Sequence, residues 1–414
     1  MSGTIFNNES EMQVWLSTKL KEGDGLNDLI INREDFNLYL PKSLSDEKVF
    51  DSFKYCLASL DIVEIISEND NISFNPSDSL KPDFLLYAPE TEAIVIVELK
   101  NIVTPSRQAG TEISAYANEV KTYIPFISDG DIINVLISSV WPTLLKHYAF
   151  HEIFWQQRNL LCLEPIIDKG EVKLRILDVS SIAEDTVSFT LCNEHIGGFQ
   201  LCLYDYNLYE DQSNRTRLDP YVSQMKTALS AMASKGNAQK NHGFAFLWKD
   251  NWELSLAPYS ISIFNFAPFQ SFERHFHNEN FEPNIIVKKI VNIIKEHDPM
   301  GHGGSLISIT EVGESFLANF CTPRVEGFQN WQTLSEDMLK RCSPLLSFRC
   351  WGAIEEVFTK KLLQKYNKGD ISIAFDDPDI GLEVIRELID PNYQFYNIFW
   401  EDEREDLFDD MEDI

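Results

Sequence analysis

Two carboxylates and a lysine occur in a pattern typical of a metal-dependent hydrolase, at Asp83, Glu98 and Lys100. Asp83–Ala88 and Ala93–Lys100 are strand-length segments separated by four turn-forming residues, which predicts a β-hairpin. If the strands pair symmetrically about that turn, Asp83 lies directly opposite Glu98. Directly opposed Cβ atoms are about 5 Å apart. The two carboxylates are therefore expected to share one cation.

The second segment of the hairpin is apolar on both faces until its last residues. Side chains alternate along a strand, so Glu98 and Lys100 share one face. Charges at the end of a buried strand cost free energy unless they have a partner. Asp83, Glu98 and the backbone carbonyl of Leu99 form an oxygen-rich ligand set that favours Mg²⁺ or Mn²⁺. Such a metal would polarise a phosphodiester oxygen and lower the pKa of a bound water, which Lys100 would orient or activate.

A helix is expected directly after the hairpin, over residues 105–123. It places Gln108, Glu112 and Tyr116 at i, i+4 and i+8 on one polar stripe. Such a stripe is suited to hydrogen-bond Lys100 or a phosphate. Together with the hairpin, the helix completes a set of six candidate catalytic residues.

This set resembles the PD-(D/E)XK nuclease superfamily, and Pro82-Asp83 matches the literal "PD" of its motif. The resemblance covers about residues 46–180. It implies a restriction-endonuclease-like mixed sheet flanked by helices, and Mg²⁺-dependent cleavage of nucleic acid. It also implies an acidic residue from a preceding helix, for which Glu47 is the nearest candidate, with Glu11 behind it. The helix departs from the family pattern, since both Gln108 and Glu112 precede Tyr116 at helical spacing.

Three regions are expected along the chain. Residues 1–185 combine helices at 9–21, 46–60, 105–123 and 142–157 with strands at 61–66, 72–74, 83–88, 93–100, 131–139, 160–167 and 172–179. This alternation predicts an α/β nuclease domain with an N-terminal helical extension. Residues 186–395 are expected to form an α+β domain that binds a partner or nucleic acid, and residues 396–414 an acidic tail.

The net charge of −30 constrains how the protein finds a substrate. Residues 376–414 hold 15 acidic and 2 basic residues, whereas residues 191–375 are nearly neutral, with 20 and 18. Proteins that bind nucleic acid unaided usually carry a basic surface. We therefore expect a protein partner or a homo-oligomer, with DNA as the favoured nucleic acid.

The location expected from the sequence is the cytoplasm. Residues 1–10 carry no basic segment followed by an apolar run, which argues against a secretory signal. No apolar run is long enough to span a membrane, so no membrane partner is expected. The seven cysteines lack metal-binding spacing.

Two functions from different classes remain open. The first is an endonuclease that acts as an effector in prokaryotic antiviral defence; in domain order and length the chain is similar to nuclease–APAZ proteins that pair with short Argonautes. The second is a catalytically silent nuclease-fold scaffold that serves as a protein interaction module. The presence of Asp83, Glu98 and Lys100 together favours the enzyme, because a decayed site would not require all three.

Overall fold

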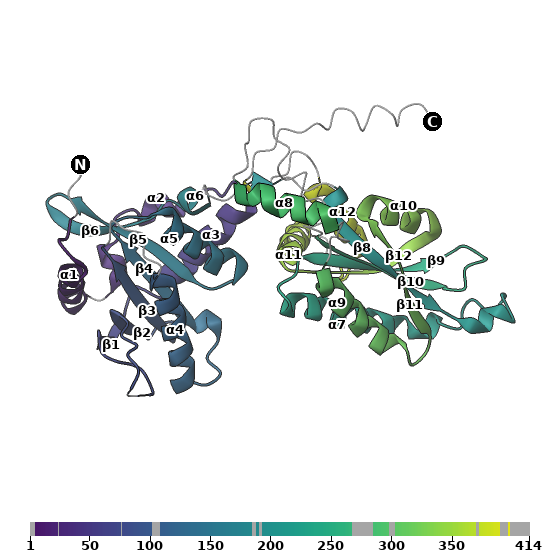
Figure 1. Ribbon diagram of the computed structural model, residues 1–414, viewed down its shortest axis with the longest axis horizontal. Helices are drawn as coiled ribbons and strands as arrows, with labels where there is room; N and C mark the ends of the chain where they lie inside the picture. Colours follow the sequence, from purple (N-terminus) through teal and green to yellow (C-terminus); the bar gives the residue numbers. More distant parts are fainter. Residues whose placement is uncertain are drawn as a thin grey trace, which may run out of the picture. The chain divides into compact units, whose positions relative to one another are not determined.

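The chain folds into two units: the first contains the residues up to Ser188 together with Tyr396–Asn397, and the second begins at Phe189 (Figure 1). The structure is a computed structural model, and it describes residues 5–23, 25–75, 77–101, 108–183, 188–189, 193–266, 285–297, 303–369, 372–389 and 396–397. Two short strands, β7 (Ser188–Phe189) and β13 (Tyr396–Asn397), pair with each other. Beyond these two residues, the expected acidic tail at 396–414 lies outside the described residues.

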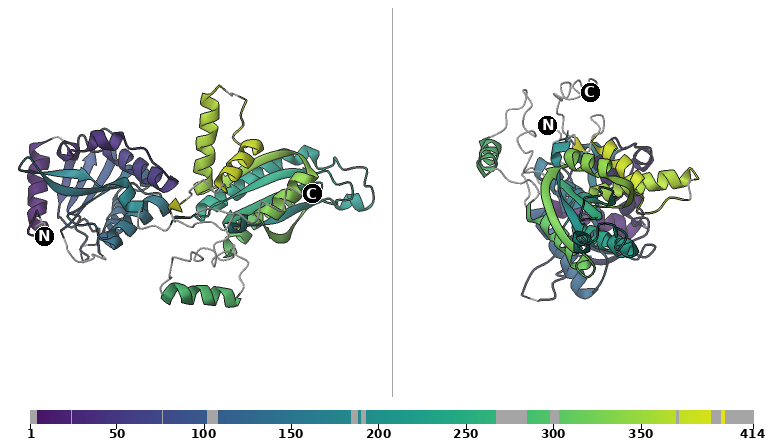
Figure 2. Two further views of the ribbon diagram at one scale, coloured as in Figure 1. Left: turned by 90° about the horizontal axis from the view of Figure 1, so that it is seen from above. Right: turned by 90° about the vertical axis from the view of Figure 1, so that its right-hand side faces the viewer.

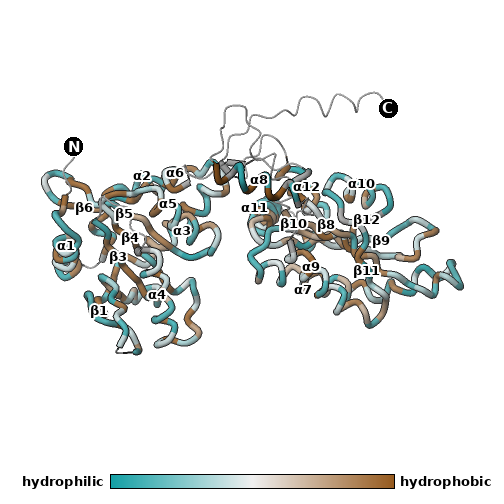
Figure 3. Tube along the Cα trace, in the orientation of Figure 1, coloured by the Kyte–Doolittle hydropathy of each residue, from teal (hydrophilic) through white to brown (hydrophobic). Residues whose placement is uncertain are grey.

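The first unit is built on a six-stranded mixed sheet in the order β1-β2-β3-β4-β5-β6. Its strands are β1 (Glu64–Glu68), β2 (Phe84–Ala88), β3 (Ala93–Lys100), β4 (Ile132–Ser138), β5 (Leu160–Asp168) and β6 (Glu171–Ile176). Strands β3, β4 and β5 are parallel, and the remaining pairs are antiparallel. Strands β3 and β4 are buried along their whole length, so both are continuous apolar runs with little alternation. Figure 3 shows this hydrophobic centre in brown.

Helices flank this sheet. They are α1 (Glu9–Glu22), α2 (Arg33–Asn37), α3 (Leu44–Leu57), α4 (Gln108–Tyr123), α5 (Thr143–Phe150) and α6 (Val179–Ala183), with short helical turns η1 (Leu26–Leu29), η2 (Asp129–Asp131) and η3 (His151–Trp155). Tyr116 and Val120 of α4 pack with Ile94 and Ile96 of β3. Because side chains alternate along a strand, Glu98 and Lys100 point to the same face as these two isoleucines. Helix α3 packs against β4 and β5.

The expected α/β unit with a mixed sheet flanked by helices is confirmed. One expected strand, at residues 72–74, is wrong. There the Ile72 N–H donates to the Leu80 carbonyl oxygen at 2.8 Å, and the segment belongs to the connection between β1 and β2. The local apolar residues Ile72 and Phe74 suggested a strand, but none of the described strands pairs with this segment.

The second unit contains a five-stranded antiparallel sheet in the order β11-β8-β10-β9-β12. Its strands are β8 (Ile196–Tyr204), β9 (Gly243–Asp250), β10 (Tyr259–Phe266), β11 (Thr322–Asn330) and β12 (Cys342–Trp351). The helices are α7 (Val222–Ala238), α8 (Ile285–His297), α9 (Gly303–Leu317), α10 (Trp331–Arg341), α11 (Ala353–Asn367) and α12 (Pro378–Leu388), with turns η4 (Asn193–His195), η5 (Tyr206–Tyr209) and η6 (Asp219–Tyr221).

Both faces of this second sheet are covered. Helices α7 and α9 pack on each other and cover one face of the sheet. Their apolar residues form a core with Leu201 of β8 and Ile261 of β10. On the other face, Trp331 of α10 packs against Phe244 and Phe246. Helices α11 and α12 lie against each other and against the edge strand β12, and they are the two yellow-green helices of Figure 2.

Candidate active site

The register of the β2–β3 hairpin places Asp83 beside Glu98. Ala88 pairs with Ala93, and Phe84 pairs with Val97, so the register predicted from the four-residue turn is confirmed. Asp83 directly precedes β2, and continuing the register by one residue sets it opposite Glu98. The Asp83 Oδ2 atom accepts a hydrogen bond of 2.7 Å from the backbone N–H of Leu99. This bond holds the carboxylate against the end of β3.

Glu98 and Lys100 form a buried ion pair on the face that α4 covers. Their exposed fractions are 3% and 7%, and the Lys100 Nζ atom donates to Glu98 Oε1 at 2.5 Å. The second carboxylate oxygen, Glu98 Oε2, is buried and has no hydrogen-bond partner among the residues that the structure describes. A buried carboxylate oxygen without a partner is costly. It therefore marks a position suited to a cation or a hydrogen-bond donor.

Two further carboxylates surround Lys100. The Nζ atom lies 3.1 Å from Glu112 Oε2 and 3.9 Å from Glu9 Oε1. The contact with Glu112 is an ion pair without hydrogen-bond geometry, and that oxygen has no hydrogen-bond partner among the described residues. The Lys100 ammonium group thus contacts the carboxylates of three glutamates, and Asp83 is a fourth acidic residue nearby.

Burial is the main cause of the raised pKa values of the two carboxyl groups in this site. Burial raises the pKa of Asp83 to about 6, although the Leu99 N–H opposes the shift. Burial also raises the pKa of Glu98 to about 9, and the charge of Asp83 adds to the shift. For Lys100, burial disfavours the charged form, but the neighbouring charge of Glu98 outweighs it and keeps the pKa above its usual range. A cation bound between the two carboxyl groups would favour their ionised forms and would therefore lower both pKa values.

The residues present fit a divalent cation with oxygen ligands. Asp83 and Glu98 supply two carboxylates. The Lys100 carbonyl accepts from Ser139 N on the β4 side, and successive strand residues direct their backbone groups to opposite edges, so the Leu99 carbonyl points to the Asp83 side. Among the described residues no group of three or more His, Cys, Asp or Glu side chains is arranged to hold a metal ion. Mg²⁺ commonly uses only one or two carboxylates and fills its other positions with water, so this donor set suffices.

The helical residues of the predicted set have different environments. Gln108 is the first residue of α4, and its side chain lies outside the described residues. Glu112 reaches Lys100. The Tyr116 hydroxyl donates to the Lys81 carbonyl oxygen at 3.0 Å, and the residue is buried. Of the three, only Glu112 has a described contact with the lysine.

An acidic residue from an N-terminal helix does reach the site, and it is Glu9 of α1. Glu47 lies on α3, which packs against β4 and β5. Glu11 binds Asn7 at the start of α1. Helix α1 contacts β3 and carries Gln13, whose side chain donates to the Asp83 carbonyl at 3.4 Å. Sequence reasoning missed Glu9 because an acidic first turn is an ordinary feature of helices.

Comparison with known proteins assigns no family or function to this chain, so any functional proposal rests on the geometry of the site. Scans of protein-family models, of curated proteins and of solved structures each found no match to this chain. Within the described part of the chain, no helix is both long and apolar enough to cross a membrane.

Proposed function

We propose that the first unit is a divalent-metal-dependent nuclease with a restriction-endonuclease-like fold of the PD-(D/E)XK type. The observation that carries the proposal is the convergence of Asp83 and Glu98 beside Lys100, with Glu98 Oε2 buried and without a hydrogen-bond partner among the described residues. Carboxylates in this state need added positive charge. Mg²⁺ or Mn²⁺ supplies that charge together with a water of lowered pKa and an electrophilic contact to a phosphate oxygen.

Each residue of the chain has a distinct role in this proposal. Asp83 and Glu98 hold the cation with the Leu99 carbonyl as a backbone ligand. Lys100 is held by Glu98 on one side and by Glu112 on the other, which fixes its Nζ atom at the end of β3. From there the ammonium group donates a proton in a hydrogen bond to the attacking water or to a phosphate oxygen, and so stabilises the charge that develops there.

The charge of the chain supports a partner that delivers the substrate. At −30, the chain as a whole repels a polyanion, and the four acids around Lys100 add to the repulsion. We propose that a protein partner or a second copy supplies the basic surface for DNA. An effector role in prokaryotic defence accords with a nuclease that cuts only when such a partner presents the target.

The alternative is a nuclease-fold scaffold without activity. The absence of a third converging acidic, histidine or cysteine ligand among the described residues is the observation in its favour. The buried oxygen of Glu98 that has no partner within the described part of the chain weighs against it, because a scaffold gains nothing from a costly buried acid.

The test is cleavage of supercoiled plasmid and of single-stranded DNA and RNA by the full chain, in Mg²⁺ and in EDTA, with and without co-purifying proteins. Lys100→Met should lower the cleavage rate by roughly 100-fold, the scale expected when one charge-stabilising donor is lost. The matched control is Lys173→Met, because Glu171-Val-Lys173 repeats the Glu-x-Lys triplet on β6. Equal rates in wild type and Lys100→Met would leave the scaffold as the better account.

A further inference from the structure

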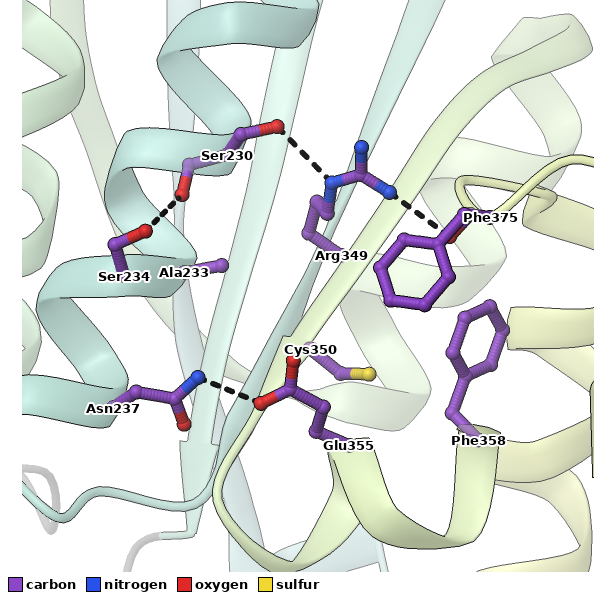
Figure 4. A pocket seen from close by; sticks show the side chains of 9 residues that line it. All are labelled: Ser230, Ala233, Ser234, Asn237, Arg349, Cys350, Glu355, Phe358 and Phe375. Atoms are coloured by element: carbon purple, nitrogen blue, oxygen red, sulfur yellow. Dashed lines mark hydrogen bonds between the residues drawn. The ribbon is translucent and has the colours of Figure 1, made fainter. Parts of the chain in front are cut away.

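A cavity of about 260 Å³ lies in the second unit where α7, β12 and α11 meet (Figure 4). Its floor is apolar and buried, and is made by Ala233, Cys350 and Phe358. Phe375 stands at the rim with 58% of its side chain exposed. The rest of the lining is polar and consists of Ser230, Ser234, Asn237, Arg349 and Glu355. The cavity therefore combines an apolar floor, an exposed aromatic ring and a polar wall.

Most of the polar groups are already occupied by the protein. The Ser230 hydroxyl donates to the Lys226 carbonyl, and the Ser234 hydroxyl donates to the Ser230 carbonyl. Asn237 donates to Glu355 Oε2 at 2.6 Å and accepts from Gly352 N at 2.7 Å. The hydroxyl protons are thus not free for a ligand, and the Asn237 amide already uses one donor and one acceptor position.

Arg349 and Glu355 keep capacity for a ligand. Arg349 donates from Nε to Ser230 Oγ at 3.1 Å and from Nη1 to the Phe375 carbonyl at 2.9 Å. Its second terminal nitrogen, Nη2, has no hydrogen bond to any described residue, and the same holds for Glu355 Oε1. No ion pair joins either residue to the part of the chain that the structure describes. The positive charge of Arg349 and the negative charge of Glu355 thus line the same cavity without forming an ion pair with each other.

The positions of these two residues are fixed by their surroundings. The Arg349 guanidinium lies 5.3 Å from the centre of the Phe375 ring and is bonded on two sides. Glu355 is anchored by Asn237 in the first turn of α11. Burial, with a smaller effect of Glu355, raises the pKa of the Cys350 thiol, so the sulfur is an inert part of the floor. The cavity is built to bind a ligand rather than to attack one.

The ligand that fits must present acceptors to Arg349, donors to Glu355 and a flat apolar face to Phe375. Nucleobases combine a π-face with a polar edge, and proteins recognise unpaired bases by stacking and by edge hydrogen bonds. Guanine carries the acceptors O6 and N7, the atoms that arginine most often reads. Beside them it carries two adjacent donors, N1–H and the N2 amino group, which suit a carboxylate. Adenine and cytosine offer a single amino donor.

We propose that this cavity binds a guanine base, with its O6 and N7 edge at Arg349, its N1–H and N2 donors at Glu355 and its face against Phe375. The site is separate from Asp83, Glu98 and Lys100, and it does not depend on the nuclease proposal. The same base chemistry is present in a free guanine nucleotide and in an unpaired guanine of a strand, so both sources are tested.

Calorimetric titration of the full chain in EDTA measures binding without cleavage. The probes are GMP, AMP, CMP and UMP, followed by an oligothymidylate with one central guanine and the same oligomer without it. GMP should bind at least about tenfold more tightly than the other mononucleotides, the scale of one hydrogen bond to a charged group. A guanine-bearing oligomer that binds more tightly than GMP identifies a strand as the source, whereas binding of GMP alone identifies a free nucleotide.

Two variants test the contacts. Glu355→Gln keeps an acceptor for Asn237 and should abolish the preference for guanine. Phe375→Ala should weaken all bound bases by roughly tenfold, since stacking does not depend on base identity. Glu336→Gln and Phe316→Ala remove an exposed carboxylate on α10 and an exposed phenylalanine on α9, and should change neither quantity. Equal affinity for the four mononucleotides, no binding of GMP or the guanine oligomer, or a guanine preference that survives Glu355→Gln would overturn the proposal.

Discussion

Glu98 is the residue on which the account of the first unit rests. It is buried, it shares Lys100 with Glu9 and Glu112, and one of its oxygens has no described partner. An apolar residue at this position would give a more stable fold, because a buried charge lowers stability unless it is fully paired. The residue therefore makes sense as a ligand whose cost is offset when a cation binds.

The raised pKa of Glu98 predicts the pH dependence of the metal-free protein. Burial raises the pKa of Glu98 in the folded, metal-free chain to about 9, whereas in the unfolded chain the carboxyl group titrates near its usual value of about 4.3. Between these values the folded state binds more protons, so the free energy of unfolding falls as pH rises. The slope should reach up to about 1.4 kcal/mol per pH unit. Asp83, with a pKa of about 6, acts in the same direction at lower pH.

Urea unfolding in EDTA at pH 6 and at pH 8 measures this slope. Glu98→Gln should flatten it and make the metal-free protein more stable than wild type at pH 8. Glu171→Gln, at an exposed position of β6, is the control and should keep the wild-type slope. Parallel pH dependences for wild type and Glu98→Gln would show that Glu98 is ionised in the folded protein without a metal.

Among the elements, the β2–β3 hairpin was predictable and the edges of the second sheet were not. Counting residues outward from a short turn predicts which residues of the two strands face each other. For this hairpin the count pairs Asp83 with Glu98. Strands β11 and β12 carry no clear strand pattern. They are the two edge strands of their sheet, and edge strands tolerate the proline, glycine and charged residues found in Thr322–Asn330.

Long-range contacts also limited what could be predicted of the site. Glu9 lies far from Glu98 in sequence, and only the packing of α1 against β3 brings the two near the same lysine. Helical spacing predicts that Gln108, Glu112 and Tyr116 lie on the same side of one helix. It does not predict which atoms of other elements each side chain contacts. Tyr116 is bonded to the Lys81 carbonyl, a backbone atom that no side-chain pattern reveals.

Helix α7 offers a test of how tightly the second unit is packed. A Cβ atom on Gly236 would lie 2.5 Å from Cγ and Cδ1 of Trp351, which is fully buried. Gly236→Ala should therefore lower the free energy of unfolding by about 1–3 kcal/mol, although alanine is the better helix former. At Gly304 of α9 nothing lies within 4 Å, so Gly304→Ala should be neutral or stabilising by up to about 1 kcal/mol. Urea unfolding compares the two, and equal effects would contradict this packing.

At the scale of the whole molecule, the net charge of −30 bears on the proposed action on nucleic acid. The excess of acid is uneven, since residues 401–414 alone hold nine carboxylates and one arginine. Long-range repulsion of this kind slows association with a polyanion and is screened by salt. We therefore expect the proposed nuclease, with its excess of acidic residues, to act on targets that a partner brings to it.

Removal of residues 401–414 should raise the affinity of the chain for DNA at low salt. The gain should shrink as the salt concentration increases from 50 to 200 mM, because screening weakens the repulsion that was removed (the Debye length is about 10 Å at 0.1 M). Fluorescence anisotropy with a labelled duplex measures the effect. A variant of equal length with asparagine and glutamine in place of the nine carboxylates separates charge from chain length. Unchanged affinity in both variants would show that this segment has no electrostatic influence on DNA binding.

Direct titration of a divalent cation tests the central claim, that Asp83 and Glu98 form a metal site beside Lys100. Mn²⁺ is followed by its electron paramagnetic resonance signal as it binds to the full chain, to the double variant Asp83→Asn and Glu98→Gln, and to Glu171→Gln. We expect a bound ion in wild type and in Glu171→Gln, and loss of that ion in the double variant. Mn²⁺ that binds equally to all three proteins, or to none, would contradict the account.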